Sequence, residues 1–215
     1  MIHTLCKEYS YINDLLSEMR DEKIQQDSLR FRKNVERFGL LGAYEISKTL
    51  KSKEISTTTV LGEAPCNVLK EQPVVVSILR AGLPLHNGVI DLFDRSENAF
   101  ISAYRRHHKD DSFEIEIEYL SSPSVEGKTV ILCDPMLATG SSMVLAYKAL
   151  LERGKPEKVH VLAVIASEQG VQFVRKNLPE GTEIWVGDID KELTAHAYIV
   201  PGLGDAGDLA YGSKV

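Results

Sequence analysis

The sequence predicts one α/β domain, in which a mostly parallel β-sheet is flanked by helices. Short apolar runs rich in β-branched residues recur along the chain, and helix-like amphipathic segments separate them. Parallel strands need crossover connections, usually helices, so this alternation favours a parallel sheet covered on both faces. The length of 215 residues allows a single large core, since about 70% of the unfolded surface is buried at this size.

The first strongly periodic segment lies near the N-terminus. Over residues 28–50 the apolar or small side chains recur every three or four positions: Phe31, Val35, Phe38, Gly42, Ile46 and Leu50. This spacing predicts an amphipathic helix, for which Asp27 or Ser28 is a suitable N-terminal cap. We therefore expect an N-terminal helical part over about residues 10–50.

The sheet itself is expected within about residues 70–186. Four apolar runs predict its buried strands: 74–79, 99–104, 129–133 and 159–166. Residues 141–154 predict a helix between the last two strands, with Gly154 suited to its C-terminal end. From about residue 187 onward, turn-forming residues predict a loop-rich tail packed on the core.

One segment has a different period. Phe113, Ile115, Ile117 and Tyr119 alternate strictly with glutamates. Such alternation predicts a strand with one solvated face, which either belongs to a β-hairpin projecting from the main sheet or forms an ordinary edge strand.

Composition limits the classes of function. The 25 basic and 31 acidic residues give a net charge of −6, which disfavours a broad nucleic-acid-binding face. Cys6, Cys66 and Cys133 form no CxxC pair and no even disulfide framework, so we expect the reducing cytoplasm and no structural zinc. The chain shows no signal-peptide pattern and no apolar stretch of membrane-spanning length, so no membrane partner is expected.

The most informative stretch is residues 129–143, where a buried strand ends at Cys133 and Asp134 follows. Small residues then lead into a helix, and ligands of open α/β sheets bind at this edge, where the free N–H groups of a helix start favour phosphate. Gly140 lets the backbone curl around an anion. Asp134 would repel phosphate and instead suits sugar hydroxyls or a metal. The same residues could equally form a capped turn in which Thr139 or Ser141 satisfies backbone N–H groups.

Three strings share one resemblance. DPMLATGSS at 134–142, SILRAGLPL at 77–85 and YIVPGLGDAGD at 198–208 are similar to the ribose-5-phosphate loop, the RAG loop and the uracil-binding segment of the uracil phosphoribosyltransferases, which are type I phosphoribosyltransferases. With the leading helices, the resemblance spans nearly the whole chain. It implies transfer of ribose 5-phosphate from 5-phosphoribosyl 1-diphosphate (PRPP) to uracil, giving UMP and diphosphate with Mg²⁺. It also implies one domain over residues 1–215, with a hairpin arm and a base-binding C-terminal hood at about 187–215.

The resemblance implies roles for individual residues. Those implied to bind PRPP are Arg80, Arg105, Asp134, Pro135, Met136, Leu137, Ala138, Thr139, Gly140, Ser141, Ser142 and Asp205. Those implied to contact uracil are Ile199, Gly204, Asp205 and Ala206. Arg105 and Asp205 are implied to be catalytic, and no metal ligands are assigned directly because PRPP is expected to carry the Mg²⁺.

The residues alone leave several of these roles open. Arg80 follows a buried strand, where it could pair with a diphosphate or lie in a surface turn. Arg105 begins the basic run 105–109, which could attract an anionic substrate or be a solvated segment offset by neighbouring aspartates. The glycine-rich residues 198–208 expose backbone groups that could bind the edge of uracil or simply form a surface loop.

The chain departs from the family pattern at several positions. Ser141 and Ala197 stand where the family usually has glycine, and an alanine at 197 is expected to require a negative φ. Residues 166–170 also differ, which leaves the local loop geometry open, and Leu209 replaces a common basic residue.

Two alternative functions remain at this stage. One is a phosphoribosyltransferase for another nucleobase, although orotate would favour a cation near the base loop, which offers only acids. The other is a non-catalytic regulator that senses PRPP or UMP and binds RNA, which the negative net charge disfavours. We expect a homodimer or homotetramer and keep GTP as a candidate effector.

Overall fold

The computed structural model describes residues 1–107 and 113–213, without the side chains of residues 103–107 and 113–117. The predicted α/β fold is confirmed. One sheet runs in the order β1-β10-β9-β7-β4-β5-β6, and β8 pairs with β9 beside β7. Its strands are β1 (Ile2–Thr4), β4 (Val74–Leu79), β5 (Glu97–His107), β6 (Phe113–Ser121), β7 (Thr129–Cys133), β8 (Met136–Leu137), β9 (Lys158–Ser167) and β10 (Glu183–Asp190). Neighbouring strands pair in parallel, except that β5 pairs with β6 in the antiparallel direction.

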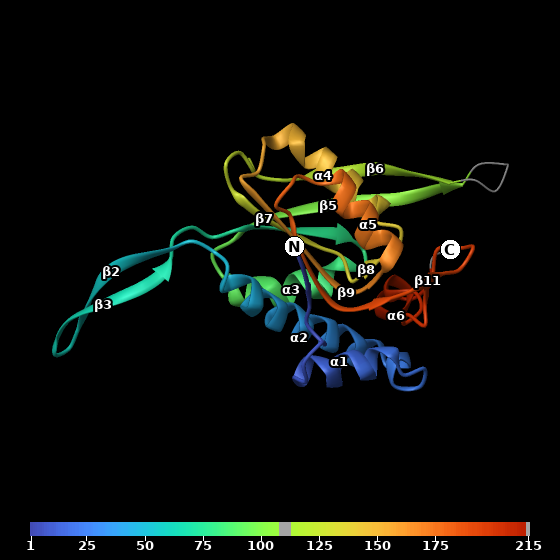
Figure 1. The fold of residues 1–215 in the computed structure, drawn as a ribbon, viewed down its shortest axis with the longest axis horizontal. Helices are drawn as coiled ribbons and strands as arrows, with labels where there is room; N and C mark the ends of the chain where they lie inside the picture. The colour runs from blue at the N-terminus through green and yellow to red at the C-terminus, as the bar shows by residue number, and fades with distance from the viewer. Residues whose placement is uncertain (108–112, 214–215) are drawn as a thin grey trace.

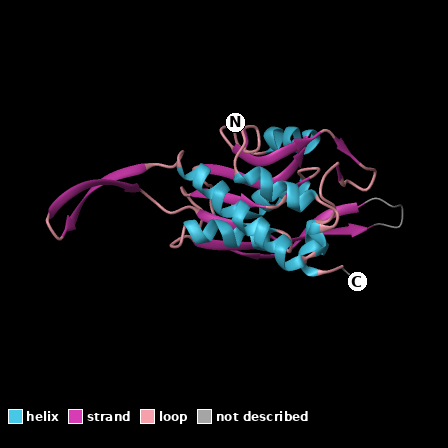
Figure 2. Ribbon diagram, turned by 90° about the horizontal axis from the view of Figure 1, so that it is seen from below, coloured by secondary structure: helices cyan, strands magenta, loops and turns pink. Residues whose placement is uncertain are grey.

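Helices cover both faces of this sheet (Figure 1). On one face lie α1 (Tyr11–Arg20), α2 (Ser28–Ser47) and α3 (Gly82–Leu92), and Figure 2 shows them across the strands. On the other face lie α4 (Ser141–Leu150) and α5 (Glu168–Asn177). The sheet therefore separates two apolar clusters, one containing Leu162 and Val164 of β9 and the other containing Val161 and Ala163. None of the helices in the described parts of the chain has the length and apolar character needed to span a membrane.

The predicted N-terminal helix is confirmed with a small shift at its end. The Asp27 side chain accepts a hydrogen bond from the backbone N–H of Arg30, so it caps α2 as expected. The helix ends at Ser47, three residues before the predicted boundary. The backbone N–H groups of residues 48–50 each donate to the carbonyl three residues earlier, so the segment ends in turns. Phe38 and Ile46 are fully buried against the sheet, which accounts for the apolar spacing.

The alternating segment forms β6, which pairs antiparallel with β5 at the edge of the main sheet. Both interpretations of its pattern therefore hold, because the edge strand is also one arm of a hairpin. A second hairpin, β2 (Ser52–Thr59) with β3 (Gly62–Leu69), forms a separate sheet that reaches away from the body (Figure 1). The sequence analysis missed it because every residue of β2 is exposed, so no apolar period marks the strand.

The C-terminal part, for which we keep the name hood, lies beside the carboxyl ends of the strands (Figure 1). Strand β10 continues to Asp190, beyond the expected boundary near residue 187. Then come β11 (Glu192–Leu193), β12 (Ile199–Val200) and the short helix α6 (Ala206–Tyr211). Arg32 of α2 donates through Nη1 to the carbonyl of Ala210 at 2.6 Å, which holds α6 against the N-terminal helices.

Ala197 corrects one expectation. Its φ is +62°, so the prediction that an alanine here requires a negative φ is wrong. The N–H of Ala197 donates to the carbonyl of Thr194, and the N–H of Tyr198 donates to Thr194 Oγ1. These turn hydrogen bonds, together with that from Thr194 N–H to the Tyr198 carbonyl, hold the alanine in the left-handed region.

Trp185, the single tryptophan of the chain, is a buried strand residue. It lies in β10 and is 4% exposed. Its ring stacks on that of His3 in β1 with centroids 3.7 Å apart, and its Nε1 donates to Nδ1 of His160 at 3.1 Å. Burial lowers the pKa of His160 to about 4, so this imidazole is neutral at physiological pH.

Candidate functional site

Asp134 lies directly after β7, at the carboxyl edge of the sheet. Its backbone N–H donates to the carbonyl of Leu162, and its Oδ1 accepts from the backbone N–H of Met136 at 3.2 Å. Met136 and Leu137 then form β8 against β9. The segment that leaves β7 is therefore tied to the sheet before it reaches α4.

Residues 138–142 form the turn that starts α4. We call this turn the phosphate loop, after the role that the sequence resemblance predicts for it. Gly140 is the N-cap residue of α4 and has a φ of +78°. Thr139 Oγ1 accepts from the backbone N–H of Ser141 at 3.3 Å and lies 3.1 Å from Ser141 Oγ. The capped-turn interpretation is thus realised in part by Thr139. The first N–H groups of a helix lack partners within it, so the loop also suits an anion.

The phosphate loop rests on the start of α5, a support that the sequence analysis missed. Ser167 Oγ donates to the carbonyl of Ala138 at 2.5 Å and accepts from the N–H of Gly170. A Cβ on Gly170 would lie 2.3 Å from the Ala138 carbonyl oxygen, so only glycine fits there. The unusual residues 166–170 therefore still brace the loop. The signal was available as a capping pattern, a serine followed by Glu168 at a helix start.

Arg80 extends from the neighbouring strand end toward the hood. Its Nη2 donates to Oδ1 of Asp208 at 3.3 Å and to the carbonyl of Gly212 at 3.2 Å. The turn after β4 abuts the end of β7, because a Cβ on Gly82 would lie 2.6 Å from the carbonyl oxygen of Cys133. The RAG loop, the end of β7 and the hood therefore meet at one place.

Asp205 brings a second carboxylate to this place. It caps α6, since its Oδ1 accepts from the N–H of Asp208 at 2.9 Å. The pKa of Asp134 is raised to about 7, mainly by burial and in smaller part by the negative charge of Asp205. The two carboxyl groups are therefore close enough to repel each other.

The comparisons with known proteins agree with this geometry. Residues 7–213 match the family model described as uracil phosphoribosyltransferase. The chain belongs to the uracil phosphoribosyltransferase family. It is an enzyme of the pentosyltransferase class.

Relatives within the uracil phosphoribosyltransferase family match along nearly their whole length. A uracil phosphoribosyltransferase from Porphyromonas gingivalis is 53% identical over 215 residues, covering 100% of this chain and 99% of that protein. One from Thermococcus gammatolerans is 37% identical over 208 residues, covering 95% and 91%. The solved structure of the AQ2163 protein from Aquifex aeolicus covers 100% of both chains, with a TM-score of 0.88 and 32% identity. A hypoxanthine phosphoribosyltransferase from Staphylococcus aureus, at 17% identity and a TM-score of 0.50 over 75% of this chain and 76% of that one, shares the fold.

The structure brings most of the predicted site residues of this uracil phosphoribosyltransferase family member together. Arg80, Asp134, Asp205 and the phosphate loop share one edge of the sheet. Arg105 lies in β5 opposite Ile115, but its side chain is outside the described part of the structure. Asp208 was not predicted as a site residue. Only the structure indicates it, through its hydrogen bond from Arg80.

The carboxylates of Asp134 and Asp205 fit a Mg²⁺ that is shared with a bound phosphate compound. The two carboxyl groups, of which Asp205 acts electrostatically on Asp134, are hard oxygen donors of the kind that Mg²⁺ binds alongside substrate phosphates. Within the described residues, no group of three or more His, Cys, Asp or Glu side chains is arranged to hold a metal by itself.

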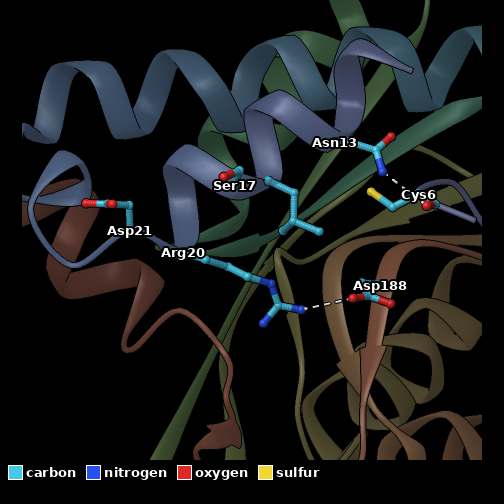
Figure 3. A pocket seen from close by; sticks show the side chains of 7 residues that line it. Cys6, Asn13, Ser17, Arg20, Asp21 and Asp188 are labelled. Carbon is cyan, nitrogen blue, oxygen red and sulfur yellow. Dashed lines mark hydrogen bonds and ion pairs between the residues drawn. The ribbon is translucent and has the colours of Figure 1, made fainter. Parts of the chain in front are cut away.

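A cavity of about 530 Å³ lies between α1 and the end of β10 (Figure 3). It is lined by Cys6, Asn13, Leu16, Ser17, Arg20, Asp21 and Asp188. Arg20 projects from α1 toward Asp188 across this cavity, at 3.3 Å from its Oδ2. Burial raises the pKa of the Cys6 thiol to about 11, so the thiol is protonated at neutral pH.

Proposed function

We propose that the chain transfers the 5-phosphoribosyl group of PRPP to N1 of uracil, with Mg²⁺, releasing diphosphate and UMP. The observation that carries this proposal is the meeting of a cation, Arg80, two carboxylates, Asp134 and Asp205, and the phosphate loop at one edge of the sheet. Each part matches one part of PRPP: its diphosphate, its ribose and its 5-phosphate.

The 5-phosphate of PRPP is assigned to the phosphate loop. Its anionic charge is stabilised by the N-terminal end of α4 and by the hydroxyls of Thr139, Ser141 and Ser142. Pro135, Met136 and Leu137 complete the predicted PRPP-binding segment, and their role is to connect Asp134 to the loop at fixed distance through the pairing of β8 with β9.

The diphosphate is assigned to Arg80 and Arg105. A guanidinium pairs with diphosphate oxygens through two parallel hydrogen bonds, which stabilises the charge that grows on the leaving group. Asp134 and Asp205 would hold the Mg²⁺ with PRPP, and the ion would neutralise part of the diphosphate charge. The hydroxyls of the ribose are also assigned to Asp134.

The base is assigned to the hood. Ile199, Gly204, Asp205 and Ala206 supply backbone groups for the alternating donors and acceptors of uracil, and the φ of Gly204 is +90°. The C1–O bond to the diphosphate breaks through an oxocarbenium-like state. The bond from uracil N1 to C1 forms on the opposite side, and the proton of N1 is released to water. Holding both reactants in this alignment is the main contribution of the protein.

The deciding experiment is one assay with purified protein, PRPP, Mg²⁺ and separate reactions with uracil, cytosine, orotate, hypoxanthine and adenine. We expect UMP and diphosphate from uracil only. Faster conversion of another base would establish the sister activity instead. No conversion of any base, together with tight RNA binding at physiological salt, would establish the regulator.

Two variants test the residues proposed to be catalytic. Arg105→Ala and Asp205→Asn should each lower turnover by at least about tenfold, since each loses on the order of 1.4 kcal/mol of transition-state stabilisation. Arg95→Ala and Asp94→Asn change exposed residues in the turn between α3 and β5 and serve as matched controls that should keep full turnover. Wild-type turnover in either site variant would remove that residue from the mechanism.

We also propose that residues 1–215 act as one domain, assemble as a homodimer or homotetramer, and work in the cytoplasm. The β2–β3 hairpin supports assembly, because Val60 and Leu61 at its tip are 99% and 96% exposed, and exposed apolar side chains favour an interface. Free Cys6, Cys66 and Cys133 support a reducing compartment. Light scattering measures the oligomeric state. Adding GTP to the assay with PRPP and uracil tests whether GTP changes the rate of UMP formation.

A further inference from the structure

Arg20 connects the last turn of α1 to the hood through its guanidinium. Nη1 donates to Asp190 Oδ2 at 2.7 Å and to the carbonyl of Gly202 at 2.8 Å, and Nη2 donates to Asp190 Oδ1 at 2.9 Å. Asp190 Oδ2 also accepts from the backbone N–H of Gly202 at 2.9 Å. The pair therefore holds both the N–H and the C=O of one residue, and we call Arg20, Asp190 and Gly202 the clamp.

The clamp is enclosed. The side chain of Asp190 is 7% exposed and that of Arg20 is 21% exposed. Burial of an ion pair costs solvation energy, and removal of one partner leaves an uncompensated charge. Here Nη1 and Nη2 of Arg20 and both carboxylate oxygens of Asp190 are hydrogen-bonded. This two-pronged geometry makes an arginine–carboxylate pair strong and directional. The clamp therefore fixes the position of Gly202 far more closely than apolar packing would.

Gly202 cannot be replaced without moving the segment that bears it. Its φ is +60°, and a Cβ there would lie 2.0 Å from the carbonyl oxygen of Ile199. Ile199 precedes it by three residues and Gly204 follows it by two, and both belong to the segment proposed to contact uracil. Any displacement of Gly202 therefore moves the backbone groups on both sides that would meet the base.

We propose that Arg20 and Asp190 are positioning residues for base recognition, an inference that rests on the proposed function. They touch neither uracil nor PRPP. They hold Gly202 so that the backbone of residues 199–206 presents its donors and acceptors at the spacing of the uracil edge. The phosphate loop lies on a different segment and makes no hydrogen bond to the clamp within the described residues. Asp205, the proposed PRPP contact within residues 199–206, is held separately by its hydrogen bond from the N–H of Asp208 in α6. The KM for PRPP should therefore change much less than the KM for uracil.

The test compares Asp190→Asn, Arg20→Lys and Arg20→Ala with the control Arg30→Lys. Arg30 also forms a two-pronged pair with a carboxylate, that of Glu18, but on the exposed side of α2. Each clamp variant should raise the KM for uracil at least about tenfold and change the KM for PRPP less than about twofold. Arg30→Lys should leave both constants at their wild-type values.

Chemical rescue distinguishes positioning from a general loss of folding. Truncation in Arg20→Ala opens a space that joins the cavity lined by Asn13, Ser17 and Asp188, through which methylguanidinium can reach Asp190. Added methylguanidinium should lower the uracil KM of Arg20→Ala at least threefold and leave Asp190→Asn unchanged. If Arg20→Ala does not fold, the inference is tested by comparing the change in the KM for uracil with the change in the KM for PRPP in Asp190→Asn.

Three outcomes overturn the inference: wild-type uracil KM in all clamp variants, equal increases of the two KM values, or a loss of kcat alone. These are distinguishable from failure of the proposed function, because in that case the wild-type protein itself forms no UMP.

Discussion

Arg80 and Asp208 form an ion pair in which guanidinium Nη2 lies 3.3 Å from carboxylate Oδ1, so the RAG loop is joined to the hood. Both side chains are 39% exposed, and such a pair contributes no more than about 1 kcal/mol to stability. The arginine proposed to bind the diphosphate of PRPP is therefore already engaged by a carboxylate. Diphosphate and Asp208 compete for the same cation.

Asp208→Asn should relieve this competition. We expect the KM for PRPP to fall up to about fivefold, the equivalent of about 1 kcal/mol, with the free energy of unfolding changed by less than about 1 kcal/mol. Steady-state kinetics with varied PRPP, together with a denaturation curve, measures both. The control is Asp94→Asn, which should change neither. A higher KM in Asp208→Asn would mean that Asp208 supports PRPP binding rather than competing with it.

Gly140→Ala should disable the phosphate loop. A Cβ at this position would lie 2.8 Å from the carbonyl oxygen of Gly170, and the φ of +78° is unfavourable for alanine by about 1–2 kcal/mol. We expect the KM for PRPP to rise at least about tenfold and stability to fall by about 2–3 kcal/mol. Gly181→Ala is the matched control, because its φ is +86° and no atom lies within 4 Å of the added Cβ. It should lose stability without a change in the KM for PRPP.

Ala197→Gly should stabilise the protein. Relief of the left-handed conformation exceeds the entropy that glycine adds to the unfolded chain, for a net gain of about 0.5–1 kcal/mol. At this chain length the melting temperature should rise by about 2–4 °C per kcal/mol. Ala195→Gly, two residues earlier and outside the positive-φ region, is the control and should lower the melting temperature or leave it unchanged. An equal shift in both variants would contradict the explanation.

The partly buried carboxyl of Asp134 predicts a pH dependence of stability. Its pKa is about 7 in the folded chain, against 3.8 for an ordinary aspartate. Between these values the folded state keeps a proton that the unfolded state has lost, so the free energy of unfolding falls as pH rises from about 4 to 7. Asp134→Asn removes this effect. Without ligand, the variant should match the wild type near pH 4 and exceed its stability by at least about 1 kcal/mol at pH 8.

Denaturation curves at several pH values give the comparison. Asp94→Asn, an exposed substitution, should follow the wild type throughout. A constant difference between Asp134→Asn and the wild type across the whole range would show that the carboxyl ionises normally in the folded protein.

The sheet and its covering helices could be predicted because burial requires apolar residues, as continuous runs in buried strands and at every third or fourth position in helices. Strands 74–79 and 129–133 are bounded as predicted, since nearly every side chain in them is buried. The β2–β3 hairpin could not be predicted in this way, because β2 is polar and exposed throughout and β3 is at most half-buried. Its pairing rests on backbone hydrogen bonds, to which every residue type except proline can both donate and accept.

The site was predicted through motifs, and the parts missed are those that motifs do not contain. Arg20 and Asp190 are 170 positions apart, and each is an ordinary polar residue in its own segment. Only the fold brings them to Gly202. In the same way, Asp134 is recognisable in sequence, but its raised pKa depends first on its burial in the fold and then on the charge of Asp205 from the hood. Arg105 was assigned through the resemblance, and its role stays a prediction.

The stacked Trp185 is an intrinsic fluorescent probe of the protein. Because the chain has a single tryptophan, all indole fluorescence comes from one point, between the rings of His3 and His160. That point lies on the strand that ends in Asp190. Its emission therefore reports, without any label, whether β1 is seated on β10 and whether the strand that carries the clamp is intact.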